Sequence, residues 1–100
     1  MSKLAGKSIM ITGGAQGIGE GIAQRLASEG ASITIVDLNG DKAKAVAESL
    51  KSEGGKAIGV KVDVADRGQV QTAIKEAVKS FGRLDVLFNN AGFNKPRPFL

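Results

Sequence analysis

The sequence predicts an α/β fold in which a parallel sheet carries helices on both faces. Short β-branched runs alternate with longer segments whose apolar residues recur every three or four positions. Glycine follows each of the three helical segments, where a left-handed residue commonly ends a helix. Four strands separated by three helices imply parallel pairing with right-handed crossovers, so we expect the strand order 3-2-1-4.

The elements follow one another in a regular order along the chain. The expected strands cover residues 8–11, 31–37, 57–62 and 84–88. The first helix carries its apolar residues at 18, 22, 23, 26 and 27 and ends before Gly30, and the second covers about 41–53. Asp66 is the expected N-cap of the third helix, with Gln69 as a capping-box partner and Gly82 as the stop. The chain is therefore expected to form one small α/β unit.

Composition excludes several classes of function. Hydrophobic residues make up 42% and charged residues 24% of the 100 residues, which are globular values. The net charge of +4 would suit a nucleic-acid partner if it were clustered, but no two basic residues are adjacent. We therefore expect a solvated basic surface and no nucleic-acid partner.

The chain contains no histidine, cysteine, tyrosine or tryptophan. This rules out a Ser-His or Cys-His nucleophile pair and the usual zinc ligand sets within these 100 residues. The lack of cysteine fits a reducing compartment. Residues 1–7 lack the apolar stretch of a signal peptide, and nothing approaches the apolar length of a membrane span. A soluble cytoplasmic protein with no membrane partner is expected.

A glycine-rich turn connects the first strand to the first helix. It reads Thr12-Gly-Gly-Ala-Gln-Gly-Ile-Gly19, and glycines there let the backbone approach a pyrophosphate that faces the helix N-terminus. A Walker loop would end in Gly-Lys-Ser/Thr, and the ordinary Gly-x-Gly-x-x-Gly pattern would need glycine at Ile22. The pattern that fits is Thr-Gly-x-x-x-Gly-x-Gly. A tight turn without a ligand is the alternative for an isolated glycine cluster.

An acidic residue ends the second expected strand. Asp37 lies 18 residues after Gly19, near the distance at which dinucleotide folds place an acid on the adenosine ribose hydroxyls. A helix N-cap or a solvated turn carboxylate is the alternative interpretation. The carboxylate disfavours a 2′-phosphate, and neither Gln16 nor Leu38 supplies a compensating cation, so NAD is the expected cofactor.

Two further polar segments follow strands. Asp63-Val64 comes after the third strand, where Asp63 could also be a turn former. Asn89-Asn90-Ala91-Gly92 follows the fourth strand; its asparagines could tie strand ends together, and its small residues would let a cofactor lie against the backbone. In isolation this tetrapeptide would be interpreted as a turn.

These motifs together resemble the short-chain dehydrogenase/reductase family over the whole chain. The resemblance implies a Rossmann fold that binds NAD(H), and an oxidoreductase that moves hydride between nicotinamide and an alcohol or ketone. It also implies a homo-oligomer. It assigns the adenine amino group to Asp63 and packing to Val64. The cofactor loop would be lined by Thr12, Gly13, Gln16, Gly17, Ile18 and Gly19, and closed by Asn90, Ala91 and Gly92.

The chain departs from the family in its chemistry. The resemblance implies general acid–base catalysis by a Tyr-x-x-x-Lys pair that a serine assists. This chain has no tyrosine. No residue of 1–100 is therefore expected to be catalytic. We expect these residues to be the NAD-binding portion of a single longer domain, truncated before its catalytic half. A stand-alone or degenerate NAD-binding module without catalysis is the alternative.

Overall fold

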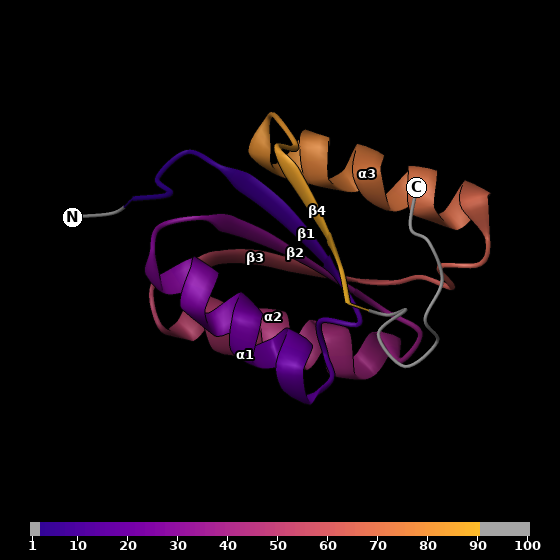
Figure 1. The fold of residues 1–100 in the computed structure, drawn as a ribbon, viewed down its shortest axis with the longest axis horizontal. Coiled ribbons are helices and arrows are strands. Elements are labelled where there is room, and N and C mark those ends of the chain that lie inside the picture. Colours follow the sequence, from indigo (N-terminus) through magenta and orange to yellow (C-terminus); the bar gives the residue numbers. More distant parts are fainter. Residues whose placement is uncertain (1–2, 91–100) are drawn as a thin grey trace.

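A computed structural model describes residues 3–90, which form one parallel sheet with helices on both faces (Figure 1). The sheet order is β3-β2-β1-β4, as predicted. All three strand pairings are parallel. The strands are β1 (Ser8–Thr12), β2 (Ser32–Asp37), β3 (Lys56–Lys61) and β4 (Val86–Asn89), and the helices are α1 (Gly17–Ser28), α2 (Gly40–Ser52) and α3 (Arg67–Phe81).

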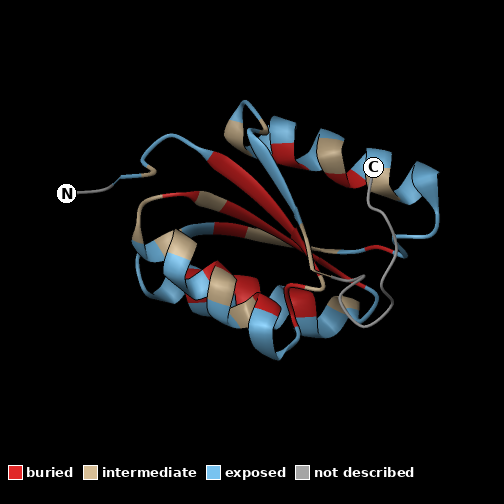
Figure 2. Cartoon of the chain, in the orientation of Figure 1, coloured by how far each residue is buried: buried red, intermediate tan, exposed pale blue. Residues whose placement is uncertain are grey.

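The alternation of side chains along the strands produces two cores. One face of the sheet, which includes Ile11 and Ile33, packs against α1 and α2, while the opposite face packs Met10 and Val36 against α3 (Figure 2). Successive residues of a strand point to opposite faces, so β1 and β2 contribute to both cores. The central strands are consequently buried on both faces, as expected for a parallel sheet covered on both sides, and most of their buried side chains are apolar.

All three predicted helix stops are confirmed by the backbone, and Gly30 and Gly82 illustrate them. Gly82 is the C-cap of α3, with a φ of 82°, and its N–H donates to the Val78 carbonyl. Gly30 follows the last residues of α1 with a φ of 100°. Both values lie in the left-handed region that glycine adopts without a steric cost.

The fourth strand begins two residues later than predicted. Leu84 does not join the sheet but packs against the α3-side core. Asp85 precedes the strand and bonds twice to Ser8: the Asp85 N–H donates to the Ser8 carbonyl, and the Ser8 N–H donates to the Asp85 carboxylate. This side-chain bond replaces the first ladder bond, so regular pairing begins at Ile9 with Val86.

Within residues 3–90, β4 pairs with β1 on one side only. Its side chains Val86, Leu87 and Phe88 are exposed, in contrast to the buried central strands (Figure 2). An uncovered apolar strand edge favours association with another strand. No helix of the described part is long and apolar enough to cross a membrane.

Candidate functional site

The parallel strands bring the predicted site residues to one edge of the sheet. Thr12 pairs with Val36 of β2 and with Asn89 of β4, so the glycine loop leaves β1 between the ends of both neighbours. From β1 the chain continues to β2 and β3 on one side of β1, and it then crosses to β4 on the other side. Such a switch point, at the carboxyl ends of the strands, is where open α/β sheets bind ligands.

The glycine loop is fixed by its own backbone and by β2. The N–H groups of Gly13 and Gly14 both point to the Val36 carbonyl, at 2.8 and 3.4 Å, and the Gln16 N–H donates to the Gly13 carbonyl at 3.1 Å. Gly13 has a φ of 66°, which favours glycine at this position. The loop is therefore a defined turn and not a loose connection.

Gly19 is required where α1 passes over the loop. A Cβ at this position would overlap the Gly13 carbonyl oxygen and would lie 2.9 Å from Asn90 Nδ2. Gly17 differs, because a Cβ there would meet no atom of the described chain within 4 Å and its φ is not positive. Packing within the described chain thus explains Gly19 but not Gly17.

Thr12 and the two asparagines form a network that joins β1 to β4. The Thr12 hydroxyl donates to Asn89 Oδ1 at 2.7 Å and accepts from the Asn90 N–H at 2.9 Å. Asn90 Nδ2 lies 3.4 Å from the Gly13 carbonyl and donates to it. The predicted role of asparagines in tying strand ends together is thus seen at Asn89 and Asn90. Ala91 and Gly92 lie outside the described residues.

Asp37 is buried, with 6% of its surface exposed, and it is not the N-cap of α2. That cap is Asn39, whose side chain accepts from the Lys42 N–H. The Asp37 carboxylate instead accepts from the Asn39 N–H at 3.0 Å and from the Ala15 N–H at 3.2 Å. The carboxylate therefore bonds to the glycine loop.

Asp63 and Val64 lie on an exposed turn after β3. Asp63 Oδ1 accepts from the Ala65 N–H at 2.9 Å, which is the geometry of a turn-forming aspartate. Its own N–H donates to Gln69 Oε1 at 2.8 Å. Asp63 thus shapes this turn, as the alternative interpretation expected. Its other carboxylate oxygen accepts no hydrogen bond from residues 3–90.

The capping box predicted for α3 is only half right. Asp66 is the N-cap, and its carboxylate accepts from the Gln69 N–H. The Gln69 side chain does not return to the Asp66 N–H, because that group already donates to the Asp63 carbonyl. Gln69 bonds instead to the Asp63 N–H and to the Asp66 carboxylate. Gln69 therefore stabilises the turn at Asp63, whereas the sequence prediction gave it a role only in capping the helix.

The N-terminus of α1 differs from those of the other two helices. Side chains cap α2 and α3, whereas Gln16 at the N-cap of α1 makes no side-chain cap bond. The first N–H groups of a helix need acceptors, and with the helix dipole they form a site for an anion. The one uncapped helix N-terminus of the described chain is therefore the one that follows the glycine loop.

Three large apolar side chains near this edge are exposed: Ile18 at 63%, Leu38 at 65% and Val64 at 45%. They come from α1 and from the turns after β2 and β3, which are separate segments of the chain. All three are predicted site residues. Their exposure leaves apolar surface available to the flat rings of a ligand.

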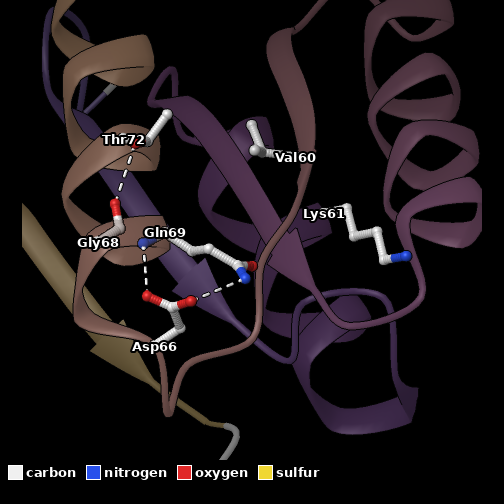
Figure 3. A pocket seen from close by; sticks show the side chains of 6 residues that line it. All are labelled: Val60, Lys61, Asp66, Gly68, Gln69 and Thr72. Carbon is white, nitrogen blue, oxygen red and sulfur yellow. Dashed lines mark hydrogen bonds between the residues drawn. The ribbon is translucent and has the colours of Figure 1, made fainter.

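A hollow of about 440 Å³ lies elsewhere, between β3 and the start of α3 (Figure 3). Its lining includes Lys61, Gln69 and Thr72, and no predicted site residue. Several polar groups there already bond to one another, as Gln69 does to Asp66 (Figure 3). Residues 3–90 also contain no cluster of acidic side chains that could hold a metal ion.

Comparison with known proteins identifies a family for this chain. The model of the short chain dehydrogenase family matches residues 7–100. The chain is 44% identical over 98 residues to 2,5-dichloro-2,5-cyclohexadiene-1,4-diol dehydrogenase LinX of Sphingobium indicum, covering 98% of this chain and 39% of that protein. It is 43% identical over 100 residues to oxidoreductase UcpA of Salmonella typhimurium, covering all of this chain and 38% of that one.

Solved structures share the fold. The crystal structure of hydroxysteroid dehydrogenase from Escherichia coli superposes with a TM-score of 0.86 at 36% identity, over 96% of this chain and 41% of that one. The predicted Rossmann-type sheet is thereby confirmed. The chain spans about two fifths of the length of these relatives. It belongs to the short-chain dehydrogenase family and corresponds to the N-terminal part of its members.

Proposed function

We propose that this edge of the sheet binds NAD(H), and that the protein transfers hydride between nicotinamide and an alcohol or ketone. The observation that carries the proposal is the uncapped N-terminus of α1 beside Gly17, whose missing side chain leaves open space. A pyrophosphate would accept from the first N–H groups of α1. The bound nicotinamide would supply the hydride acceptor or donor.

The surrounding residues fit the remaining parts of a dinucleotide. Asp37 would accept from the adenosine ribose hydroxyls, and Asp63 with Val64 would meet the adenine. Ile18 and Leu38 would cover apolar surface of the cofactor, since both are exposed at this edge. Asn90, with Ala91 and Gly92 after it, would close the site beyond β4. Thr12, Gly13 and Gln16 would shape the loop itself.

NAD is proposed over NADP because of charge. A 2′-phosphate at the ribose would lie against the buried Asp37 carboxylate, and unpaired like charges at a desolvated site cost several kcal/mol, on the order of 2–5. The ion pairs of residues 3–90 involve Arg25, Lys51 and Arg83, and none of them reaches Asp37. Leu38, next in sequence, brings no cation.

Catalysis as the family resemblance implies it requires a tyrosine, which residues 1–100 do not contain. The oxygen of an alcohol must lose a proton as hydride leaves its carbon, and the acid–base group must lie within hydrogen-bond reach. The sequence has no histidine, tyrosine or cysteine, and Asp37 and Asp63 are proposed to bind the adenosine end of the cofactor. We therefore infer that this group lies outside residues 1–100 of one longer domain. The same absence supports a second candidate, an NAD-binding module without catalysis. We further infer a cytoplasmic homo-oligomer that acts on a small molecule.

Titration of the full-length protein with NADH and NADPH tests the cofactor assignment. Tighter binding of NADH is expected, and Leu38→Arg should raise NADPH affinity because it adds a cation without changing the Asp37 bonds. Leu38→Ala is the matched control and should leave the preference for NADH in place. Equal affinities in the wild type, or tighter NADPH binding, would contradict the proposal.

Turnover distinguishes the two candidate functions. Alcohol-dependent reduction of NAD⁺ by the full-length protein is expected if it is a dehydrogenase. Binding of NADH without turnover on a broad set of alcohols and ketones would favour the non-catalytic module. The 100-residue chain alone should show no turnover.

A further inference from the structure

We propose that Asp37 is a positioning residue for the glycine loop, in addition to its proposed contact with the ribose. Its carboxylate would hold the phosphate-binding backbone in the conformation that accepts the ligand. This inference rests on the proposed function of the site. It couples two properties, cofactor choice and loop geometry, in one side chain.

One of the two hydrogen bonds of Asp37 connects segments that are 22 residues apart, and the other is local. Oδ2 accepts from the Ala15 N–H at 3.2 Å in the middle of the loop, and Oδ1 accepts from the Asn39 N–H at 3.0 Å. Ala15 is fully buried, and the bond to it is buried as well. Water is therefore a poor substitute for the carboxylate at Ala15.

Ala15, which bonds to Asp37, lies next to the proposed phosphate site. Two residues after it the chain enters α1 at Gly17, whose N–H is among the groups proposed to bind pyrophosphate. On the other side, Gly13 and Gly14 are already held by the Val36 carbonyl. The Gln16 N–H bonds only within the loop, to the Gly13 carbonyl, so the Asp37 bond is what ties the Ala15 part of the turn to the end of β2. Its loss would loosen the loop next to the phosphate site.

The ribose contact and the loop contact do not compete. An ionised carboxylate offers about four lone-pair sites, and two of them receive the backbone N–H groups. The other two remain for ribose hydroxyls. Asparagine cannot reproduce this arrangement, because its amide nitrogen would direct N–H bonds toward one of the two backbone N–H groups.

Binding of two nucleotides separates the two roles. ADP carries both ribose hydroxyls, and 2′,3′-dideoxy-ADP carries neither, so a residue that acts only through the ribose cannot affect the second ligand through hydrogen bonds. In the full-length protein, Asp37→Asn should weaken binding of both, and the dideoxy nucleotide by roughly three- to tenfold, the equivalent of one lost hydrogen bond. Loss of the negative charge would by itself favour an anion, so weaker binding cannot come from charge. Asp41→Asn, which removes an exposed carboxylate in the first turn of α2, is the control and should not weaken the binding of either nucleotide.

Amide exchange supplies a second readout. In Asp37→Asn, exchange at Ala15 should accelerate while exchange in β1 and β2 stays slow, which a general loss of stability would not produce. If the variant does not fold, the wild type still tests the claim: Ala15 must exchange more slowly than Gly17. Equal exchange at these two amides would overturn the inference.

The outcomes also separate this inference from the proposed function. Unchanged binding of dideoxy-ADP by Asp37→Asn, with weaker binding of ADP, would overturn the positioning role and leave the dinucleotide site intact. Failure of the wild type to bind ADP at all would overturn the proposed function itself.

Discussion

Replacement of Gly19 by alanine is expected to destabilise the protein, although alanine is the better helix former. The new Cβ would overlap the Gly13 carbonyl and lie 2.9 Å from Asn90 Nδ2, and the backbone at Gly13 cannot move freely because its N–H is bonded to β2. Overpacking of this kind costs about 1–3 kcal/mol. The gain in helix propensity, about 1 kcal/mol, offsets part of that cost and leaves a net destabilisation of up to about 2 kcal/mol.

Gly21 provides the matched control in the same helix. A Cβ there would meet nothing within 4 Å, so Gly21→Ala should stabilise the protein by up to about 1 kcal/mol. Urea unfolding of both variants of the full-length protein should therefore show Gly19→Ala to be less stable by about 1–3 kcal/mol, the steric cost alone. Equal free energies of unfolding would refute the close approach of α1 to the loop.

Three further outcomes follow from contacts away from the glycine loop. Thr34 is fully buried, and its hydroxyl has no hydrogen-bond partner within residues 3–90. Thr34→Val should therefore raise the free energy of unfolding by about 1 kcal/mol, and a lower free energy of unfolding in urea would contradict this. The hydrogen bond from Arg83, then that from the Ser8 N–H, lowers the pKa of Asp85 in the folded state. The stabilisation by the Asp85 carboxylate is present above its unfolded pKa and is lost as the pH falls through the lower folded pKa. Asp85→Asn should therefore be the less stable protein at neutral pH, and its difference in free energy of unfolding from the wild type should shrink as the solution is acidified; a difference that does not shrink would argue against the pairing. Exposed β4 should make the 100-residue chain self-associate in sedimentation experiments, and Leu87→Lys should reduce this; a monomeric wild-type chain would count against it.

Local patterns were sufficient to predict the elements and the sheet order. Alternation of apolar runs and helical segments identified the four strands and three helices of residues 3–90, because each element carries its own periodicity. The glycine stop at Gly82 and the aspartate cap at Asp66 were also predictable, since both act within one turn of the chain. Asn39 as the cap of α2 was missed, although asparagine is a favoured N-cap residue.

Contacts between distant segments could not be predicted from local sequence patterns. The bond from Ala15 to Asp37 depends on the exact approach of the glycine loop to the end of β2, which sequence spacing does not specify. The start of β4 shifted because the Asp85 side chain replaced a ladder bond at Ser8. The edge at which the site residues meet was predictable from the topology, whereas the partners of each side chain were not.

Amide chemical shifts of the ¹⁵N-labelled full-length protein, recorded while NAD⁺ is added, test the proposed site most directly. The largest changes are expected at Gly17, Ile18 and Gly19, whose N–H groups begin the uncapped helix and are proposed to receive the pyrophosphate. Smaller changes should appear at Leu38. Shifts confined to the hollow beside Gln69, with the glycine loop unchanged, or no shifts at all, would contradict the account.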